Sequence, residues 1–300
     1  MAFLQPDIVP AMAEAIHRQL AAAPGGRLSI ETLQGWLMPK GIESVGGLKV
    51  FRDTLHELVA IGALEDDDGS ISLPGSVAGA RTRGAMPDIV RIKAMRAERD
   101  TDLWEKDADN RLLLLGARDL VRAVAWFLSL SVTAGPYDFE RTAPALSELQ
   151  ELHTGERPIF NIERWRPFER WTRYLGFSTA QPMELRNRWA EPLLPDPTQA
   201  IRPRLNSLLD HDAWTPIGEV MAALAENLPV LDGGQFRRSI HDKGAPETQA
   251  GCSSSLSLAF KRLEANGTIE LSRGGGDATT VTFADGHGAY YAMRLRRQTA

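Results

Sequence analysis

The sequence predicts a mainly helical α+β protein in which groups of helices are followed by small β-hairpins. Three observations lead to this prediction. The 300-residue chain is 43% hydrophobic and 24% charged, a composition typical of a globular protein that buries a core. Apolar residues recur at helical spacing through most of the chain. Apolar and polar residues alternate around Asp68-Gly69, and again between residues 268 and 283, as they do in hairpins.

The length of the chain predicts two or three domains, since a single hydrophobic core rarely grows beyond about 250–300 residues. Proline and glycine clusters interrupt the apolar pattern at several places. We expect an N-terminal domain at 1–85, a central helical domain at 86–200 and a C-terminal domain at 201–300.

The first domain begins with three amphipathic helices. Their apolar sets are Val9, Met12, Ile16 and Leu20, then Leu33, Trp36 and Leu37, then Leu48, Phe51, Leu55 and Leu58. Ser29 is expected to start the second helix and Gly62 to follow the third. The turn Asp68-Gly69 lies between two short alternating runs and predicts a hairpin. Three helices followed by a β-hairpin predict a winged helix, a variant of the helix-turn-helix fold.

The last domain repeats this order. Thr215 and Pro216 are expected to be the N-cap and first residue of a helix. Residues 235–243 are expected to form a second short helix, and Ser253–Ser255 to cap a third. Two alternating strands, 268–272 and 278–283, are expected to pair across a glycine-rich turn. A second winged helix is therefore predicted at this end of the chain.

The central domain is more helical. Apolar spacing predicts helices over residues 120–128 and 146–152, and the charged stretch 86–116 is expected to be a bridging helical arm. A further helix follows, with one apolar face made of Trp165, Phe168, Trp171 and Leu175.

An extended stretch follows that helix after Gly176. Residues 183–188 are expected to form the tip of a wing, and residues 189–194 its return strand. We therefore predict a third, degenerate winged helix in the middle of the chain.

The common catalytic motifs are missing from the sequence. It contains no Walker A phosphate loop, no H-E-x-x-H zinc motif and no G-x-S-x-G nucleophile elbow, and its six histidines are scattered. It also has no Asp-x-Lys or Glu-x-Lys triplet, a pattern with which many nucleases hold Mg²⁺. We expect no catalytic residues, no metal site and no cofactor. The one cysteine, Cys252, excludes a disulfide framework and is expected to be a buried small hydrophobe.

The net charge of −5 argues against a dedicated non-specific nucleic-acid binder, so any such face must be local. The first candidate is the third helix of the first domain. Its residues Lys49, Arg52 and His56 lie opposite the apolar face, the arrangement in which a recognition helix meets phosphates or base edges. Against this, the acidic run 65–68 at the wing tip would repel a phosphate backbone. A solvated face or a protein contact is the alternative.

Two further candidate faces are basic. In the last domain the exposed face of the third helix is expected to carry the residues Ser254, Ser257, Lys261 and Arg262, with Arg273 at the start of the wing. Hydroxyl groups at a helix N-terminus suit phosphate oxygens, although simple capping explains them equally. In the central helix the arginines are Arg166, Arg170 and Arg173. The neighbouring tryptophans fall on the apolar face, so a core with a solvated charged face is the competing interpretation.

Five short stretches resemble the G component of bacterial Dpd systems. They are DLVRAVAWFL at 119–128, YLGF at 174–177, LPDPTQAI at 194–201, LPVLDGG at 228–234 and LSLAFKRL at 256–263. The resemblance spans residues 100 to 285 and rests on short structural motifs. Dpd systems insert 7-deazapurines into DNA and restrict unmodified DNA. The resemblance implies a non-catalytic accessory subunit of the restriction arm and no catalytic residues.

Two functions stay open. The first is a defence-system accessory subunit that binds double-stranded DNA through its local basic faces. The second is a winged-helix assembly subunit with no direct DNA contact, similar to the acidic, dimeric subunits that bind bacterial kleisins. Other subunits of a defence complex are expected partners in both, and a homodimer fits either. The N-terminal residues lack a signal-peptide pattern and the longest uncharged run, 123–137, is too short to span a bilayer. A cytoplasmic protein without membrane contact is therefore expected.

Overall fold

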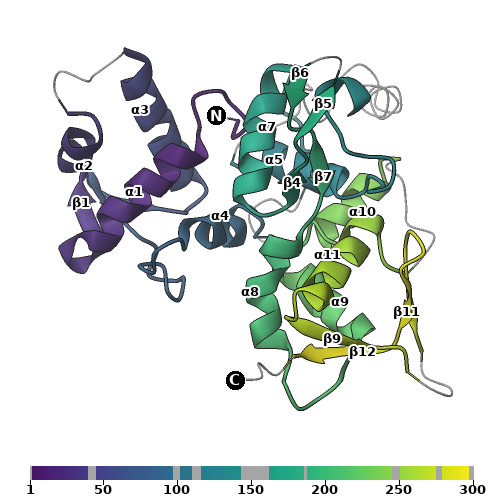
Figure 1. Ribbon diagram of the computed structural model, residues 1–300. Coiled ribbons are helices and arrows are strands. Elements are labelled where there is room, and N and C mark those ends of the chain that lie inside the picture. The colour runs from purple at the N-terminus through teal and green to yellow at the C-terminus, as the bar shows by residue number, and fades with distance from the viewer. Residues whose placement is uncertain are drawn as a thin grey trace. The chain divides into compact units, whose positions relative to one another are not determined.

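The fold is mixed α+β, with helices and several small antiparallel sheets, in the computed structural model (Figure 1). The structure describes residues 2–39, 45–96, 102–109, 116–142, 162–185, 188–244, 251–274 and 279–296. The predicted helix around 146–152 lies outside these residues, as do parts of the predicted arm at 86–116. Within the described ranges, no helix is long and apolar enough to cross a membrane.

The chain divides into two compact units. Unit 1 comprises residues 1–121 and 160–175, and unit 2 comprises residues 122–159 and 176–300. The division into three domains at 85 and 200 stays a prediction.

Unit 1 begins with helices and a three-stranded sheet. The elements are α1 (Pro10–Ala22), the 3-10 turn η1 (Pro24–Gly26), β1 (Arg27–Ser29), α2 (Ile30–Leu37), α3 (Val45–Ala60), β2 (Glu65–Asp67) and β3 (Ser70–Ser72). The predicted order of three helices and a hairpin is confirmed. Strand β1, which the sequence did not predict, pairs with β3, so the antiparallel sheet has the order β1-β3-β2.

Local sequence explains the boundaries of these elements. The Ser29 hydroxyl accepts a hydrogen bond from the backbone N–H of Thr32 at 3.2 Å and caps α2. Asp68 and Gly69 both have positive φ, 49° and 81°, as a tight hairpin turn between β2 and β3 requires. The Asp66 carboxylate supports this turn by accepting a hydrogen bond from the Gly69 N–H at 2.9 Å.

The rest of unit 1 contains α4 (Met86–Ala94) and α7 (Ile162–Tyr174). Trp165, Phe168, Trp171 and Leu175 are all buried, so the predicted apolar face of α7 is confirmed. The Trp171 indole donates a hydrogen bond to the Ile8 carbonyl at 2.9 Å, and its ring packs on Phe3. The segment before α1 is therefore part of the core of unit 1.

Unit 2 repeats the arrangement of three strands seen at the start of unit 1. Its elements after residue 197 are α8 (Thr198–Leu208), β8 (Thr215–Pro216), α9 (Ile217–Asn227), α10 (Gln235–His241), α11 (Ser254–Ala265), β9 (Ile269–Ser272), β10 (Val281–Phe283), β11 (Gly288–Tyr290) and β12 (Ala292–Leu295). Strands β8, β12 and β9 form an antiparallel sheet in that order, while β10 pairs with β11.

Two expectations for this region are wrong. Residues 268–272 do not pair with 278–283, because β9 pairs with β12 and β10 turns back onto β11. Thr215 and Pro216 form the edge strand β8, and Pro216 is the N-cap of α9 rather than its first residue. Proline suits an edge strand because it has no N–H to leave unpaired.

Unit 2 also contains α5 (Arg118–Phe127), whose first residues up to Val121 belong to unit 1, and a long hairpin. In the hairpin β4 (Ser178–Ala180) pairs with β7 (Leu193–Pro195), and β5 (Met183–Leu185) pairs with β6 (Arg188–Ala190). These pairings agree with a turning back of the chain between 183 and 194, but the return segment is two short strands rather than one, and residues 186 and 187 of the predicted tip lie outside the described residues.

Asp119 ties the N-terminal segment to α5 inside unit 1. Its carboxylate accepts hydrogen bonds from the backbone N–H groups of Phe3 at 3.1 Å and Leu4 at 2.8 Å, all of them buried. We expect Asp119→Ala to lower the free energy of unfolding by about 3 kcal/mol, because two buried donors lose their acceptor. Urea titration followed by tryptophan fluorescence measures this loss.

Asp102→Ala is the matched control, since the Asp102 carboxylate is exposed and accepts a hydrogen bond from the nearby Trp104 N–H. Its expected cost is below about 0.5 kcal/mol. Equal losses in the two variants would show that Asp119 does not secure the segment.

Candidate functional site

The candidate face on α3 is exposed but only partly available. Lys49, Arg52 and His56 all lie at the surface, as predicted. The Lys49 ammonium pairs with Asp7 and, at 2.9 Å, with Asp53, and these hydrogen bonds raise the pKa of Lys49. Arg52 and His56 line a groove beside α3.

This groove, called here the α2–α3 groove, lies between α2, α3 and the β2-β3 hairpin. It has a volume of about 750 Å³. Its apolar lining consists of Ile30, Met38, Phe51, Leu55, Val59 and Ile71. Its polar rim includes Glu31, Arg52 and Asp66. Phe51 and Leu55, which the sequence predicts to point inward, are buried, whereas Ile30, Met38 and Val59 are half-exposed and no other described part of unit 1 covers them.

The arginine face of α7 is exposed. Arg166, Arg170 and Arg173 all lie at the surface, and Arg170 donates a hydrogen bond to the Pro6 carbonyl at 3.1 Å. The tryptophans of the same helix are buried, and the Trp165 indole donates to Glu169 at 2.6 Å. The three arginines therefore lie at the surface of unit 1, while the tryptophans of this helix belong to its core.

The start of α11 is closed inside unit 2. The Ser254 hydroxyl accepts a hydrogen bond from the Val132 N–H at 2.8 Å and donates one to Asp285. Ser257 is fully buried, and its hydroxyl accepts a hydrogen bond from the Ala284 N–H at 2.9 Å. The expectation that Ser257 lies on an exposed face is wrong. Ser254 is half-buried and engaged on both sides.

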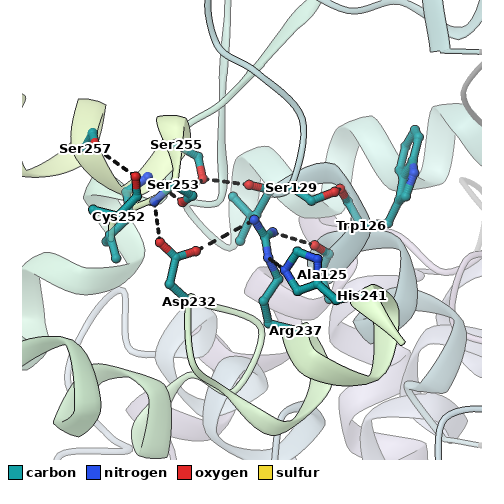
Figure 2. A network of polar contacts seen from close by, with 12 residues as sticks. Ala125, Trp126, Ser129, Asp232, Arg237, His241, Cys252, Ser253, Ser255 and Ser257 are labelled. Carbon is teal, nitrogen blue, oxygen red and sulfur yellow. Dashed lines mark hydrogen bonds and ion pairs between the residues drawn. The ribbon is translucent and has the colours of Figure 1, made fainter. Parts of the chain in front are cut away.

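The loop before α11 is held by a polar network (Figure 2). Ser253 caps the helix by accepting from the Leu256 N–H, and its own N–H donates to Asp232 at 2.6 Å. The Ser255 hydroxyl donates to the Leu128 carbonyl at 2.8 Å. These bonds attach the first turn of α11 to the end of α5 and to the loop that precedes α10.

Arg237 of α10 is the centre of this network. Its guanidinium is buried and donates a hydrogen bond to the Ala125 carbonyl at 2.9 Å and another to the His241 ring at 3.0 Å. The nearest Asp232 oxygen is 3.7 Å from the guanidinium. Burial lowers the pKa of Arg237, and the negative charge of Asp232 opposes this shift.

A tight turn places Asp232 and Arg237 together. The backbone N–H groups of Phe236 and Arg237 both donate to the Pro229 carbonyl. A Cβ atom at Gly234 would lie 2.3 Å from that carbonyl oxygen, so only glycine fits there. The stretch 228–234 is therefore needed for the geometry of the network.

The remaining predicted residues of α11 are also engaged within unit 2. Lys261 pairs with Glu264 and with the Tyr290 hydroxyl at 3.1 Å. Arg262 pairs with the buried Asp196, whose carboxylate also accepts a hydrogen bond from the N–H of Thr198, the first residue of α8, at 3.1 Å.

Arg273 differs from these two residues. It is exposed, and its guanidinium lies 5.8 Å from the centre of the Tyr290 ring. The structure therefore does not bring the predicted residues of the last domain together as one open basic surface.

A second cleft was not predicted. It has a volume of about 1030 Å³ in unit 2, and its basic lining is Arg202, His211 and Arg296. Arg202 and Arg296 are 94 positions apart in the sequence (296 − 202), so no local pattern links them. Asp212 also lines the cleft and offsets part of the positive charge.

The described part of the chain holds no cluster of metal ligands, and its one thiol is buried. No group of three or more potential ligands is suited to a metal ion in those residues. Cys252 is buried, as predicted, and burial raises the pKa of its thiol. A thiol in such a setting is not a nucleophile at neutral pH.

The sequence profile of the DpdG-like family matches residues 1–275 of the chain. No curated protein and no solved structure shows a significant match to this chain.

Arg237 offers a direct test of the network. Arg237→Ala leaves Asp232 inside unit 2 without its positive neighbour and the Ala125 carbonyl without its donor, so we expect a loss of about 3–5 kcal/mol in the free energy of unfolding. Urea or thermal unfolding measures the change.

The neighbouring Arg238 is the control, since it is exposed and its guanidinium donates to the nearby Gly233 carbonyl. Arg238→Ala is expected to cost less than about 1 kcal/mol. A similar small loss for Arg237→Ala would mean that the network does not hold α10, α5 and α11 together.

Proposed function

The chain belongs to the DpdG-like family, the G component of Dpd DNA-modification and restriction defence systems, and from this premise we propose that it is a non-catalytic assembly subunit of such a system. Its winged-helix modules would connect protein partners, with no DNA reading by α11. The observation that carries this proposal is the closed N-terminus of α11, where Ser257 is fully buried.

The order of elements supports two winged-helix modules. In the first module a helix, a short strand, two helices and two strands follow one another as α1, β1, α2, α3, β2 and β3. In the second, the corresponding elements are α8, β8, α9, α11, β9 and β12, with α10 and the β10-β11 hairpin inserted. In both sheets the last strand lies between the other two. The same topology therefore occurs twice.

The third helix of a helix-turn-helix module ordinarily presents its N-terminal residues to base edges. In the second module these residues bond to Leu128 and Val132 instead. A duplex would have to displace the segment at 128–132 to reach them. The module is thus better suited to holding its neighbours in place than to reading a groove.

Direct DNA contact is the second candidate function. The exposed arginines of α7 favour it, because Arg166, Arg170 and Arg173 follow one face of the helix at the surface. Phosphate contacts of this kind give weak, salt-dependent binding without sequence preference.

Complex formation tests the proposal. We expect the full chain, co-expressed with the other Dpd components, to co-purify with them as a stable assembly identified by mass spectrometry. We also expect cells without the chain to lose restriction of unmodified DNA. Restriction that persists without the chain, together with no detectable assembly, would contradict the proposal.

DNA binding at several salt concentrations separates the two candidates. The assembly proposal expects no measurable binding at roughly 50 mM salt, where phosphate contacts are least screened, in either the wild-type chain or Arg166→Glu/Arg173→Glu. The DNA-contact candidate expects this double variant to reduce the slope of log affinity against log salt by about 2. Lys261→Glu is the control, since Lys261 already pairs with Glu264.

A further inference from the structure

We propose that the α2–α3 groove binds a basic amphipathic helix of a partner protein. This inference rests on the proposed assembly function and names the chemistry of one partner surface. It concerns unit 1 alone, since every lining residue of the groove lies between residues 30 and 71.

The groove exposes apolar surface that a folded domain ordinarily covers. Phe51 and Leu55 form a buried floor, while Ile30, Met38 and Val59 are half-exposed at its sides. Clustered apolar side chains left open to solvent are characteristic of protein-binding surfaces.

The dimensions suit a helix. With eight residues, α2 is roughly 12 Å long. A bound helix places side chains at positions i, i+3 or i+4, and i+7 along one face over about the same length. A groove of about 750 Å³ has room for two or three apolar anchors of such a helix.

The charge around the groove selects a basic partner. Glu31 and Asp66 line it directly, and both are exposed. The β2-β3 hairpin adds Glu65, Asp67 and Asp68, of which Asp67 pairs with Arg27 at 3.3 Å. On α2 and this hairpin the acidic groups therefore outnumber Arg27 and Arg52 by three (5 − 2).

The acidic rim of the groove disfavours two other possible occupants, duplex DNA and a second copy of the chain. The phosphates of a duplex would approach the acidic hairpin at close range, where like charges repel. A second copy of the chain would bring its own acidic hairpin to the same place. A lysine- or arginine-rich helix with one apolar face matches both the lining and the rim.

Fluorescence anisotropy with three labelled peptides tests the proposal on the full chain. The first peptide carries leucine at i, i+3, i+4 and i+7 with lysine elsewhere. The second has glutamate in place of lysine, and the third is a scrambled form of the first without an apolar face. We expect the first to bind at least about tenfold more tightly than the other two.

Variants locate the binding. Val59→Lys puts a positive charge into the groove wall and is expected to weaken the first peptide by at least about tenfold. Glu31→Gln/Asp66→Asn removes two negative charges and keeps an oxygen acceptor for the Gly69 N–H. This double variant is expected to lower the affinity for the first peptide about fivefold. Glu163→Lys on the exposed side of α7 is the matched control and should leave the affinity unchanged.

Three outcomes of these binding experiments would contradict the proposal. Equal binding of the lysine and glutamate peptides, no measurable binding of the lysine peptide, or unchanged affinity in Val59→Lys would overturn the groove as a site for a basic helix. Binding of duplex DNA that Val59→Lys alters would assign the groove to nucleic acid instead. If Val59→Lys still enters the Dpd assembly, the groove inference fails while the assembly function stands; if the wild-type chain forms no assembly, the function itself fails.

Discussion

A buried guanidinium fixes the arrangement on which unit 2 depends. Arg237 is almost fully removed from water, and a charge in that position persists only with good acceptors around it. The Ala125 carbonyl and the His241 ring accept hydrogen bonds from it, and the Asp232 carboxylate lies 3.7 Å away with a compensating charge. Asp232 in turn accepts a hydrogen bond from the Ser253 N–H. The end of α5, the helix α10 and the start of α11 are therefore one structure. This constraint turns the first residues of α11 inward.

The two modules share the same order of strands but differ in what surrounds their third helix. In unit 2 the third helix is covered at its N-terminus and its basic residues are paired, as Arg262 is with Asp196. In unit 1 the third helix, α3, keeps an open groove beside it, and the acidic hairpin gives that groove its charge. An acidic chain with one closed and one open module fits a subunit that assembles other proteins better than one that reads a duplex.

Local features of the fold could be predicted from the sequence, and long-range ones could not. The buried face of α7 with Trp165 and Trp171 followed from spacing alone, as did the turn at Asp68-Gly69. The partner of β9 did not, because β10 and β12 are both short, with three and four residues, and lie in the same stretch of chain. The Ser255 hydroxyl donates to the Leu128 carbonyl, 127 positions away, and no sequence pattern around residue 255 predicts that contact.

Hydrogen exchange at the start of α11 tests the central claim most directly. The backbone N–H groups of Ser253, Leu256 and Ser257 all donate within unit 2, to Asp232 and to the Ser253 side chain and carbonyl. The account predicts that these amides exchange slowly in the free chain and that adding duplex DNA leaves their rates unchanged. Rapid exchange in the free chain, with protection only when duplex DNA is added, would contradict it.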